Sequence, residues 1–169
     1  MAQAGYSARS AATTDDGSPI IKIDGFLKVP DVPGESIRSG HEEQLEIYGI
    51  KFDMAANLDV NSGARRGRVR LSAVTVIKNY DKGSPYLAQA LFQNKVFDPV
   101  EIFLRRTIAT ESKDYLVIKL TEASVTNYSF QPSATEPDLL EEVVDFGFKE
   151  ITFTYDGEHE AVMDVHIGV

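Results

Sequence analysis

Hydrophobic and polar residues alternate along most of the chain after Pro19, which is the pattern of strands that bury one face. In one segment, for example, Leu116, Ile118 and Leu120 share a face. The alternation predicts a mainly β protein. The expected strands lie at residues 20–29, 43–54, 67–78, 98–106, 114–121, 123–131, 140–155 and 160–168.

Two of these segments change the phase of their alternation part-way along. One slip falls at Gly49, and the other lies between Phe148 and Ile151. A slip of one residue turns the opposite face inward, either at a bulge or where a strand passes from one sheet to another. We therefore expect a small two-sheet β-barrel in which single strands serve two walls.

One segment follows helical spacing instead. Ser84 is a suitable N-cap, Pro85 suits the first helical position, and Asn94 is a candidate C-terminal cap. The sequence thus predicts one α-helix at residues 85–93, packed alongside the barrel. Its apolar stripe is expected to comprise Leu87, Ala88, Leu91 and Phe92.

The chain has 169 residues, enough for one domain. Residues 1–18 are rich in small and polar residues without periodicity, so we expect a flexible tail before a single domain at 19–169. The N-terminus lacks the apolar core of a secretory signal. No apolar run approaches the roughly 18 residues of a membrane span. These features favour a protein made in the cytoplasm without membrane insertion.

The net charge of −9 is unevenly placed. Residues 133–169 hold ten acidic residues and one lysine, whereas residues 1–132 are balanced. This acidity argues against nucleic acid as a partner. An opposite local charge arises from four arginines within six residues: Arg65, Arg66, Arg68 and Arg70. Two interpretations stay open, docking onto an acidic surface and a merely solvated loop, and the acidic C-terminal part offers such a surface.

Sequence motifs of catalytic, metal-binding or cofactor-binding sites are weak or absent in this sequence. The absence of Cys excludes disulfides, thiol nucleophiles and Cys-ligated metals. His159, Glu160, Asp164 and His166 lack the spacing of a zinc motif, because a second His four residues after His159 is missing. No serine-nucleophile elbow or phosphate-binding glycine loop occurs. We therefore expect neither an enzyme nor a bound metal or cofactor.

Four segments, in this order and spacing, carry a resemblance to a known family. They are residues 26–36, with Val32-Pro33-Gly34-Glu35-Ser36 as a turn; residues 78–87, Lys-Asn-Tyr-Asp-Lys-Gly-Ser-Pro-Tyr-Leu; residues 115–128; and residues 142–155. Together they resemble the Hcp (haemolysin-coregulated) proteins, the tube subunits of type VI secretion systems of Gram-negative bacteria.

The resemblance implies a β-barrel of two sheets with one helix alongside, and a ring-shaped homohexamer whose rings stack into a tube. It also implies three kinds of partner: a contractile sheath around the tube, a VgrG-like spike at its tip and small effectors in its lumen. Export through the type VI apparatus would follow synthesis in the cytoplasm.

By position, residues 55–66 correspond to the extended loop with which family members contact neighbouring subunits and rings. Because residues 65–70 are basic and residues 133–169 are acidic, we expect the arginine segment to contact the acidic C-terminal part of an adjacent subunit. The alternatives are an effector carrier or chaperone, and a monomeric ligand-binding β-barrel. The expected interface residues are Leu58, Asp59, Arg65, Arg66, Arg68, Arg70, Glu158 and Glu160.

Overall fold

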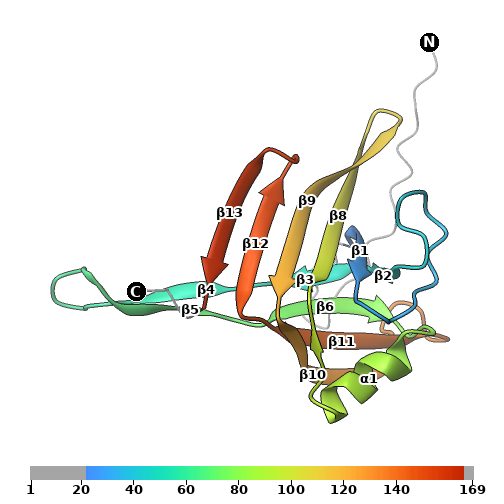
Figure 1. Cartoon of the computed structure of the whole chain (residues 1–169), viewed down its shortest axis with the longest axis horizontal. Helices are drawn as coiled ribbons and strands as arrows, with labels where there is room; N and C mark the ends of the chain where they lie inside the picture. The colour runs from blue at the N-terminus through green and yellow to red at the C-terminus, as the bar shows by residue number, and fades with distance from the viewer. Residues whose placement is uncertain (1–21, 166–169) are drawn as a thin grey trace.

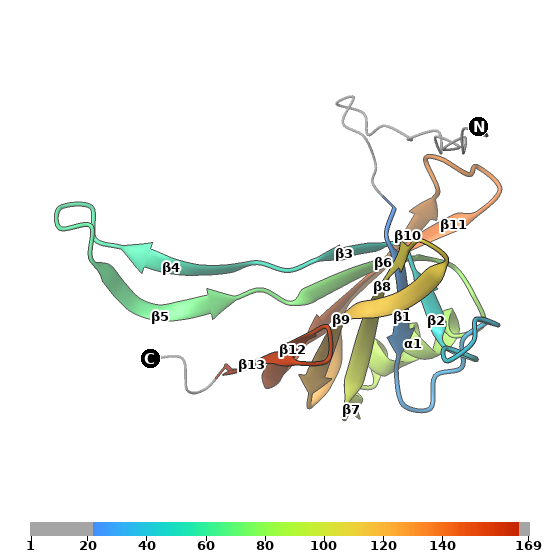
Figure 2. The same ribbon diagram turned by 90° about the horizontal axis from the view of Figure 1, so that it is seen from above.

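Two large antiparallel sheets face each other in the computed structural model, which describes residues 22–165 (Figures 1 and 2). The six-stranded sheet has, in spatial order, β13 (His159–Asp164), β12 (Glu150–Tyr155), β9 (Glu111–Thr121), β8 (Val100–Ile108), β1 (Asp24–Lys28) and β2 (Leu45–Ile47). The five-stranded sheet has β3 (Gly49–Lys51), β6 (Val74–Asn79), β11 (Leu140–Gly147), β10 (Ala123–Pro132) and β7 (Val96–Phe97). Strands β4 (Met54–Leu58) and β5 (Arg65–Leu71) form a separate two-stranded hairpin.

The chain changes sheets at both predicted phase slips. Strand β2 belongs to the six-stranded sheet and β3 to the five-stranded sheet, with only Tyr48 between them. The Tyr48 amide donates to the Ile77 carbonyl, and the Tyr48 carbonyl accepts from the Ile23 amide. Strands β11 and β12 likewise belong to different sheets. The two-sheet architecture with one helix is confirmed, although hydrogen bonds do not close the sheets into a continuous barrel.

A third predicted strand, besides the two that change sheets, is also divided into two. Residues 67–78 divide into β5 and β6, and the hairpin begins earlier than expected, so that residues 59–64 alone form its turn. The expectation of a loop at residues 55–66 was therefore wrong. Within the described residues, the first predicted strand corresponds to β1 and the last predicted strand to β13. The tail assigned to residues 1–18 lies outside the described residues.

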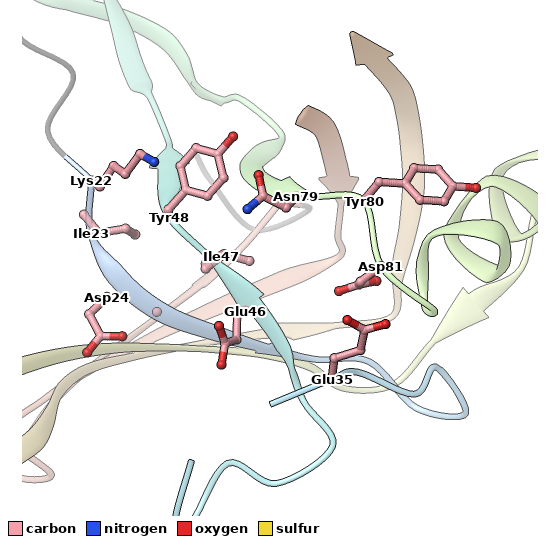
Figure 3. A pocket seen from close by; sticks show the side chains of 11 residues that line it. Lys22, Ile23, Asp24, Glu35, Glu46, Ile47, Tyr48, Asn79, Tyr80 and Asp81 are labelled. Atoms are coloured by element: carbon pink, nitrogen blue, oxygen red, sulfur yellow. The ribbon is translucent and has the colours of Figure 1, made fainter. Parts of the chain in front are cut away.

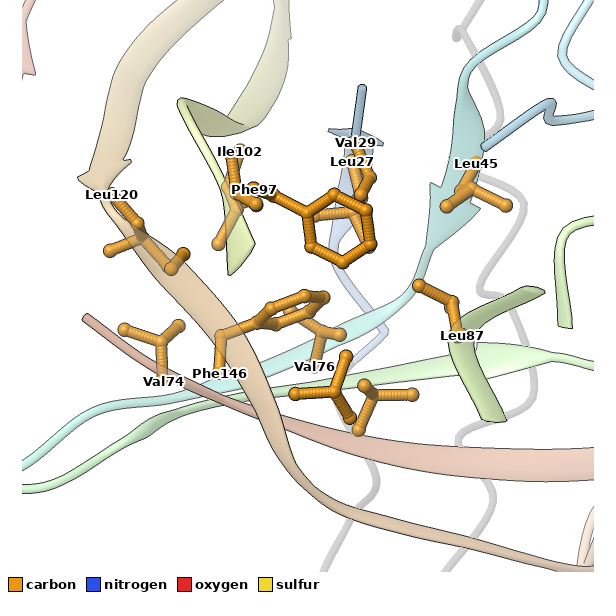
Figure 4. Packing of buried hydrophobic residues seen from close by; sticks show 14 of the residues in the cluster. Leu27, Val29, Leu45, Val74, Val76, Leu87, Phe97, Ile102, Leu120 and Phe146 are labelled. Carbon is orange, nitrogen blue, oxygen red and sulfur yellow. The ribbon is translucent and has the colours of Figure 1, made fainter. Parts of the chain in front are cut away.

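The hydrophobic core lies between the two large sheets (Figure 4). Leu27 and Ile102 point into it from the six-stranded sheet, and Val76 and Phe146 meet them from the five-stranded sheet. Each is essentially inaccessible to solvent, and burying a side chain of this size contributes about 1.5–3 kcal/mol. Helix α1 (Ser84–Phe92) adds Leu87, which is fully buried.

The helix begins one residue earlier than the sequence indicated. Its N-cap is Gly83, and no side chain caps it, so the prediction of Ser84 as N-cap was wrong. The Ser84 hydroxyl instead contacts the interior, as described below. Asn94 adopts the left-handed conformation with φ of 53°, and its amide donates to the Leu91 carbonyl. With the Lys95 amide bonded to the Ala90 carbonyl, this is a Schellman ending, which confirms Asn94 as a C-terminal capping residue.

The buried face of the helix is narrower than the predicted stripe. Leu87 and Ala90 are buried, whereas Leu91 is exposed and the Phe92 side chain is 91% exposed. The expected burial of Leu91 and Phe92 was wrong, because the helix presents only its Leu87–Ala90 side to the sheets.

Candidate functional site

The β4–β5 hairpin is a surface projection that extends well beyond the body of the molecule (Figures 1 and 2). Its base is anchored by Phe52, whose ring lies 5.6 Å from that of Phe153 and 6.3 Å from that of Phe148. Asp53 and Ser72 close the base through two hydrogen bonds, one in each direction. Beyond this point no third strand of residues 22–165 pairs with the hairpin, so both of its edges are open within that span.

Asp59 organises the turn of the hairpin. One of its carboxylate oxygens accepts the amide hydrogens of Asn61 and Ser62, at 2.9 and 3.0 Å. These bonds, that from Ser62 first, lower the pKa of the Asp59 carboxyl. The other oxygen lies 2.9 Å from Nε of Arg66, and the Gly63 amide donates to the Asp59 carbonyl. Asp59 was expected to contact a neighbouring subunit, and the structure shows that it also holds this turn.

The remaining arginines of the hairpin have no partner within residues 22–165. Arg65, Arg68 and Arg70 are exposed and make no side-chain hydrogen bond or ion pair there. Exposed apolar side chains accompany them: Leu58 is 68% exposed and Val60 98% exposed. Unpaired charges beside exposed apolar groups on a projection are typical of a surface that contacts another protein.

The other two predicted interface residues lie apart from the hairpin. Glu158 is in the turn between β12 and β13, and Glu160 is on β13, the edge strand of the six-stranded sheet. Both are exposed, and Glu160 accepts a hydrogen bond from the Thr154 hydroxyl at 3.3 Å. The structure therefore gathers Leu58, Asp59 and the four arginines on one element and leaves these two glutamates on another.

Much of the acidic C-terminal part is neutralised within the chain. Glu142 is buried against Lys78, and Asp156 lies within 3.5 Å of Arg106 and Lys113. Glu136 pairs with Lys22 at 3.3 Å. The acidic excess of residues 133–169 is thus not one open surface.

A buried polar network joins residues from three of the four segments that resemble the Hcp family. Lys78 and Glu142 are fully buried, with Nζ 2.5 Å from Oε2. Lys78 also donates to the Ser84 hydroxyl and lies 3.1 Å from Asp81. The Ser84 and Tyr128 hydroxyls both donate to Glu142. The network links strands β6, β10 and β11 to the start of helix α1.

Two tyrosines that donate hydrogen bonds to carboxylates have raised pKa values, which favours their neutral form. Burial, followed by its hydrogen bond to Glu142, raises the pKa of Tyr128 well above its usual value. Burial and the hydrogen bond to Glu141 do the same to the pKa of Tyr48. Glu141 and Glu142 therefore accept hydrogen bonds from different tyrosines.

His41 forms a buried contact that sequence reasoning missed. Its ring stacks on Phe26 at 4.2 Å, and its Nε2 lies 3.0 Å from the Asp114 carboxylate. Asp114 also accepts a hydrogen bond from Arg105. The contact fastens the β1–β2 connection to the six-stranded sheet. No local signal could have revealed it, because His41 and Asp114 are 73 positions apart.

No group of three or more His, Asp and Glu side chains within residues 22–165 is arranged to hold a metal ion. His166, one of the four residues considered for a metal site, lies outside the described residues. Across that same span, no helix is both long and apolar enough to cross a bilayer.

The sequence model described as "Type VI secretion system effector, Hcp" matches residues 26–155. The chain belongs to the Hcp family. It is similar to two proteins of Pseudomonas aeruginosa, each at 27% identity. "Protein hcp1" aligns over 135 residues, 79% of this chain and 83% of the relative. "Major exported protein" aligns over 132 residues, 75% of this chain and 77% of the relative.

Solved structures of type VI secretion proteins share the fold. "Structure of a type six secretion system protein" superposes with a TM-score of 0.76 at 24% identity, covering 87% of this chain and 98% of the other. A type VI secretion system effector from Yersinia pestis gives a TM-score of 0.69 at 25% identity, covering 84% and 100%. The Hcp fold expected from the sequence is therefore confirmed.

Proposed function

We propose that this chain is a structural subunit of the type VI inner tube, which assembles into hexameric rings that stack inside a contractile sheath. The observation that carries the proposal is the β4–β5 hairpin, an anchored projection with unpaired arginines and exposed Leu58 and Val60. Such a surface serves association better than catalysis. Membership of the Hcp family supports the same role.

The subunit would be made in the cytoplasm and exported with the tube. The similarity to the "Major exported protein" of P. aeruginosa supports export. A VgrG-like spike at the tip and small effectors in the lumen complete the proposed set of partners. The interface would use the hairpin residues. Two acidic surfaces are candidates for its other side: Glu158 and Glu160 on the β12–β13 side, and the carboxylates at the β1–β2 edge described below.

Light scattering after size exclusion tests ring formation. The expected mass is about six times the 18.7 kDa of one chain, with six-fold rings in electron micrographs. A stable monomer at micromolar concentration would overturn the proposal. Arg65→Glu with Arg68→Glu is expected to reduce assembly while leaving the far-UV spectrum of the folded chain unchanged.

The matched control reverses a lysine outside the arginine cluster. Lys51→Glu changes charge on β3, where the Lys51 side chain is 74% exposed and lies 3.7 Å from Asp53. It should leave the mass unchanged. Equal loss of assembly in the control and the arginine variant would show that net charge, rather than the hairpin surface, governs association.

A further inference from the structure

The side of the molecule opposite the hairpin carries an acidic hollow of about 440 Å³. It lies beside β2, the edge of the six-stranded sheet, and is bounded by the start of β1 and the end of β6 (Figure 3). Four carboxylates and one lysine contribute its charged side chains. They are Asp24, Glu35, Glu46, Asp81 and Lys22.

These carboxylates are unequally neutralised. Asp24 pairs with Arg38 at 2.5 Å, and Asp81 lies 3.1 Å from Lys78. Glu46, by contrast, is exposed and has no hydrogen bond or ion pair with any residue of the described span. Glu35 accepts one backbone hydrogen bond, from the Lys82 amide.

Lys22 does little to offset this charge, because its Nζ pairs with Glu136 at 3.3 Å. The hollow therefore carries negative charge, from Glu35 and Glu46, that no lysine or arginine of the described residues neutralises. That charge stands beside β2, the edge strand of the six-stranded sheet in the part of the chain that the structure describes.

The unpaired arginines lie on the other side of the same chain. The hairpin leaves the body beside β12, through the contact of Phe52 with Phe153, whereas β2 is at the opposite end of the sheet. Figures 1 and 2 both show the hairpin running away from β1 and β2. The two charged surfaces of one chain therefore point apart and cannot contact each other within that chain.

Two complementary patches on opposite sides of one subunit make a head-to-tail contact, which repeats and closes into a ring where the rotation allows. The reach of the hairpin suits such a contact. The five residues of β4 span about 16 Å in extended conformation. Since neighbouring strands are about 4.8 Å apart, that length crosses roughly three strands of an adjacent subunit.

We propose that the acidic hollow at the β1–β2 edge receives the arginines of the β4–β5 hairpin from the next copy of this chain. Glu46 and Glu35 meet Arg65 and its neighbours in this contact. The inference rests on the proposed function, since it names the surface that the hairpin occupies in the ring. It places the docking site on β2 rather than on the turn that contains Glu158.

Cross-linking locates the contact directly, because the native chain contains no Cys. The variant Glu46→Cys with Arg65→Cys is treated with a short bismaleimide and separated under denaturing conditions. The expected result is a ladder of covalent oligomers up to the hexamer. The matched variant Glu158→Cys with Arg65→Cys should give no ladder above the background of either single-Cys variant.

Charge reversal supplies a second readout. Glu46→Lys and Arg65→Glu are each expected to weaken association by roughly two- to fivefold at every contact. Combining them should restore the wild-type ring fraction at equal protein concentration. Because both side chains are exposed, neither change should disturb the fold.

Light scattering on the same samples separates the two proposals. One outcome is that rings form but the Glu46→Cys with Arg65→Cys variant gives no ladder, or only the Glu158→Cys with Arg65→Cys variant gives one. That outcome would overturn the assigned docking surface and leave the tube-subunit role intact. Monomers of the native chain would overturn the tube-subunit role itself.

Discussion

Replacing Lys78 with Met is expected to lower the free energy of unfolding by about 3–5 kcal/mol, the range for removing one partner of a buried ion pair. The Lys78 and Glu142 side chains are both inaccessible to solvent, with Nζ 2.5 Å from Oε2. Methionine would leave the Glu142 carboxylate buried with two hydroxyl donors, from Ser84 and Tyr128, and without its counter-charge. It would also leave the Asn79 carbonyl without its lysine donor.

Urea unfolding followed by far-UV circular dichroism measures this loss, at one protein concentration for all variants because assembly shifts the apparent stability. Lys113→Met is the matched control. The Lys113 side chain is 60% exposed and lies 3.5 Å from Asp156, so it should change stability by about 0–1 kcal/mol.

The double variant Lys78→Met with Glu142→Leu completes the cycle. Since apolar replacement of a whole buried pair is often close to neutral, the double variant should recover much of the loss. If Lys78→Met costs no more than Lys113→Met, or if the double variant shows additive losses, the network does not hold the five-stranded sheet to the helix.

Three further changes have defined outcomes. Tyr128→Phe should reduce the loss of stability at alkaline pH. The pKa of Tyr128 in the folded protein lies above the unfolded value of about 10. The wild type therefore keeps the full contribution of Tyr128 below about pH 10 and loses it as the pH rises further. Urea midpoints at pH 8 and 10.5 measure the difference, and equal losses in both proteins would contradict it. Gly34→Ala should cost about 3 kcal/mol in a thermal melt, because its Cβ would lie 2.0 Å from the backbone carbonyl of Gln44. Asn94→Gly should raise stability by about 0.5 kcal/mol in the same assay, because glycine adopts the φ of 53° without strain, and a lower melting temperature would refute that account.

The sheet switches could be predicted because strand periodicity is two residues. A slip of one position exchanges the inward and outward faces, so a long strand that serves two sheets shows the slip directly in its sequence. The slips at Gly49 and after Phe148 coincide with the β2–β3 and β11–β12 changes of sheet. This signal required no knowledge of distant contacts.

The hairpin was mistaken for a loop because its strands bury no face. β4 and the first half of β5 are exposed on both sides, so no hydrophobic alternation marks them. Their backbone hydrogen bonds form regardless of side-chain burial. The four arginines nevertheless marked the hairpin as a candidate interface. Their charge is the one property of this site that the local sequence could reveal.

Tertiary contacts overrode a local preference at Ser84. A serine before a proline and an apolar stripe is a favourable N-cap. Here the hydroxyl donates to Glu142 at 2.5 Å, a contact between residues 58 positions apart. Since a buried carboxylate without donors is costly, the Ser84 hydroxyl bonds to Glu142, and the helix begins at Ser84 with Gly83 as its N-cap.

The residues that point most clearly to the Hcp family are therefore those that maintain the fold. Lys78, Asp81, Ser84 and Glu142 lie in or beside a buried network, away from the hairpin. Lys78, Ser84 and Glu142 can identify an Hcp protein, but they cannot select a partner, because all three are fully buried, and only Asp81 reaches the acidic hollow. Selection must depend on exposed charges that the fold does not require, and the unpaired arginines and Glu46 meet that condition. Changes to the network should thus alter stability, whereas changes to the exposed charges should alter assembly.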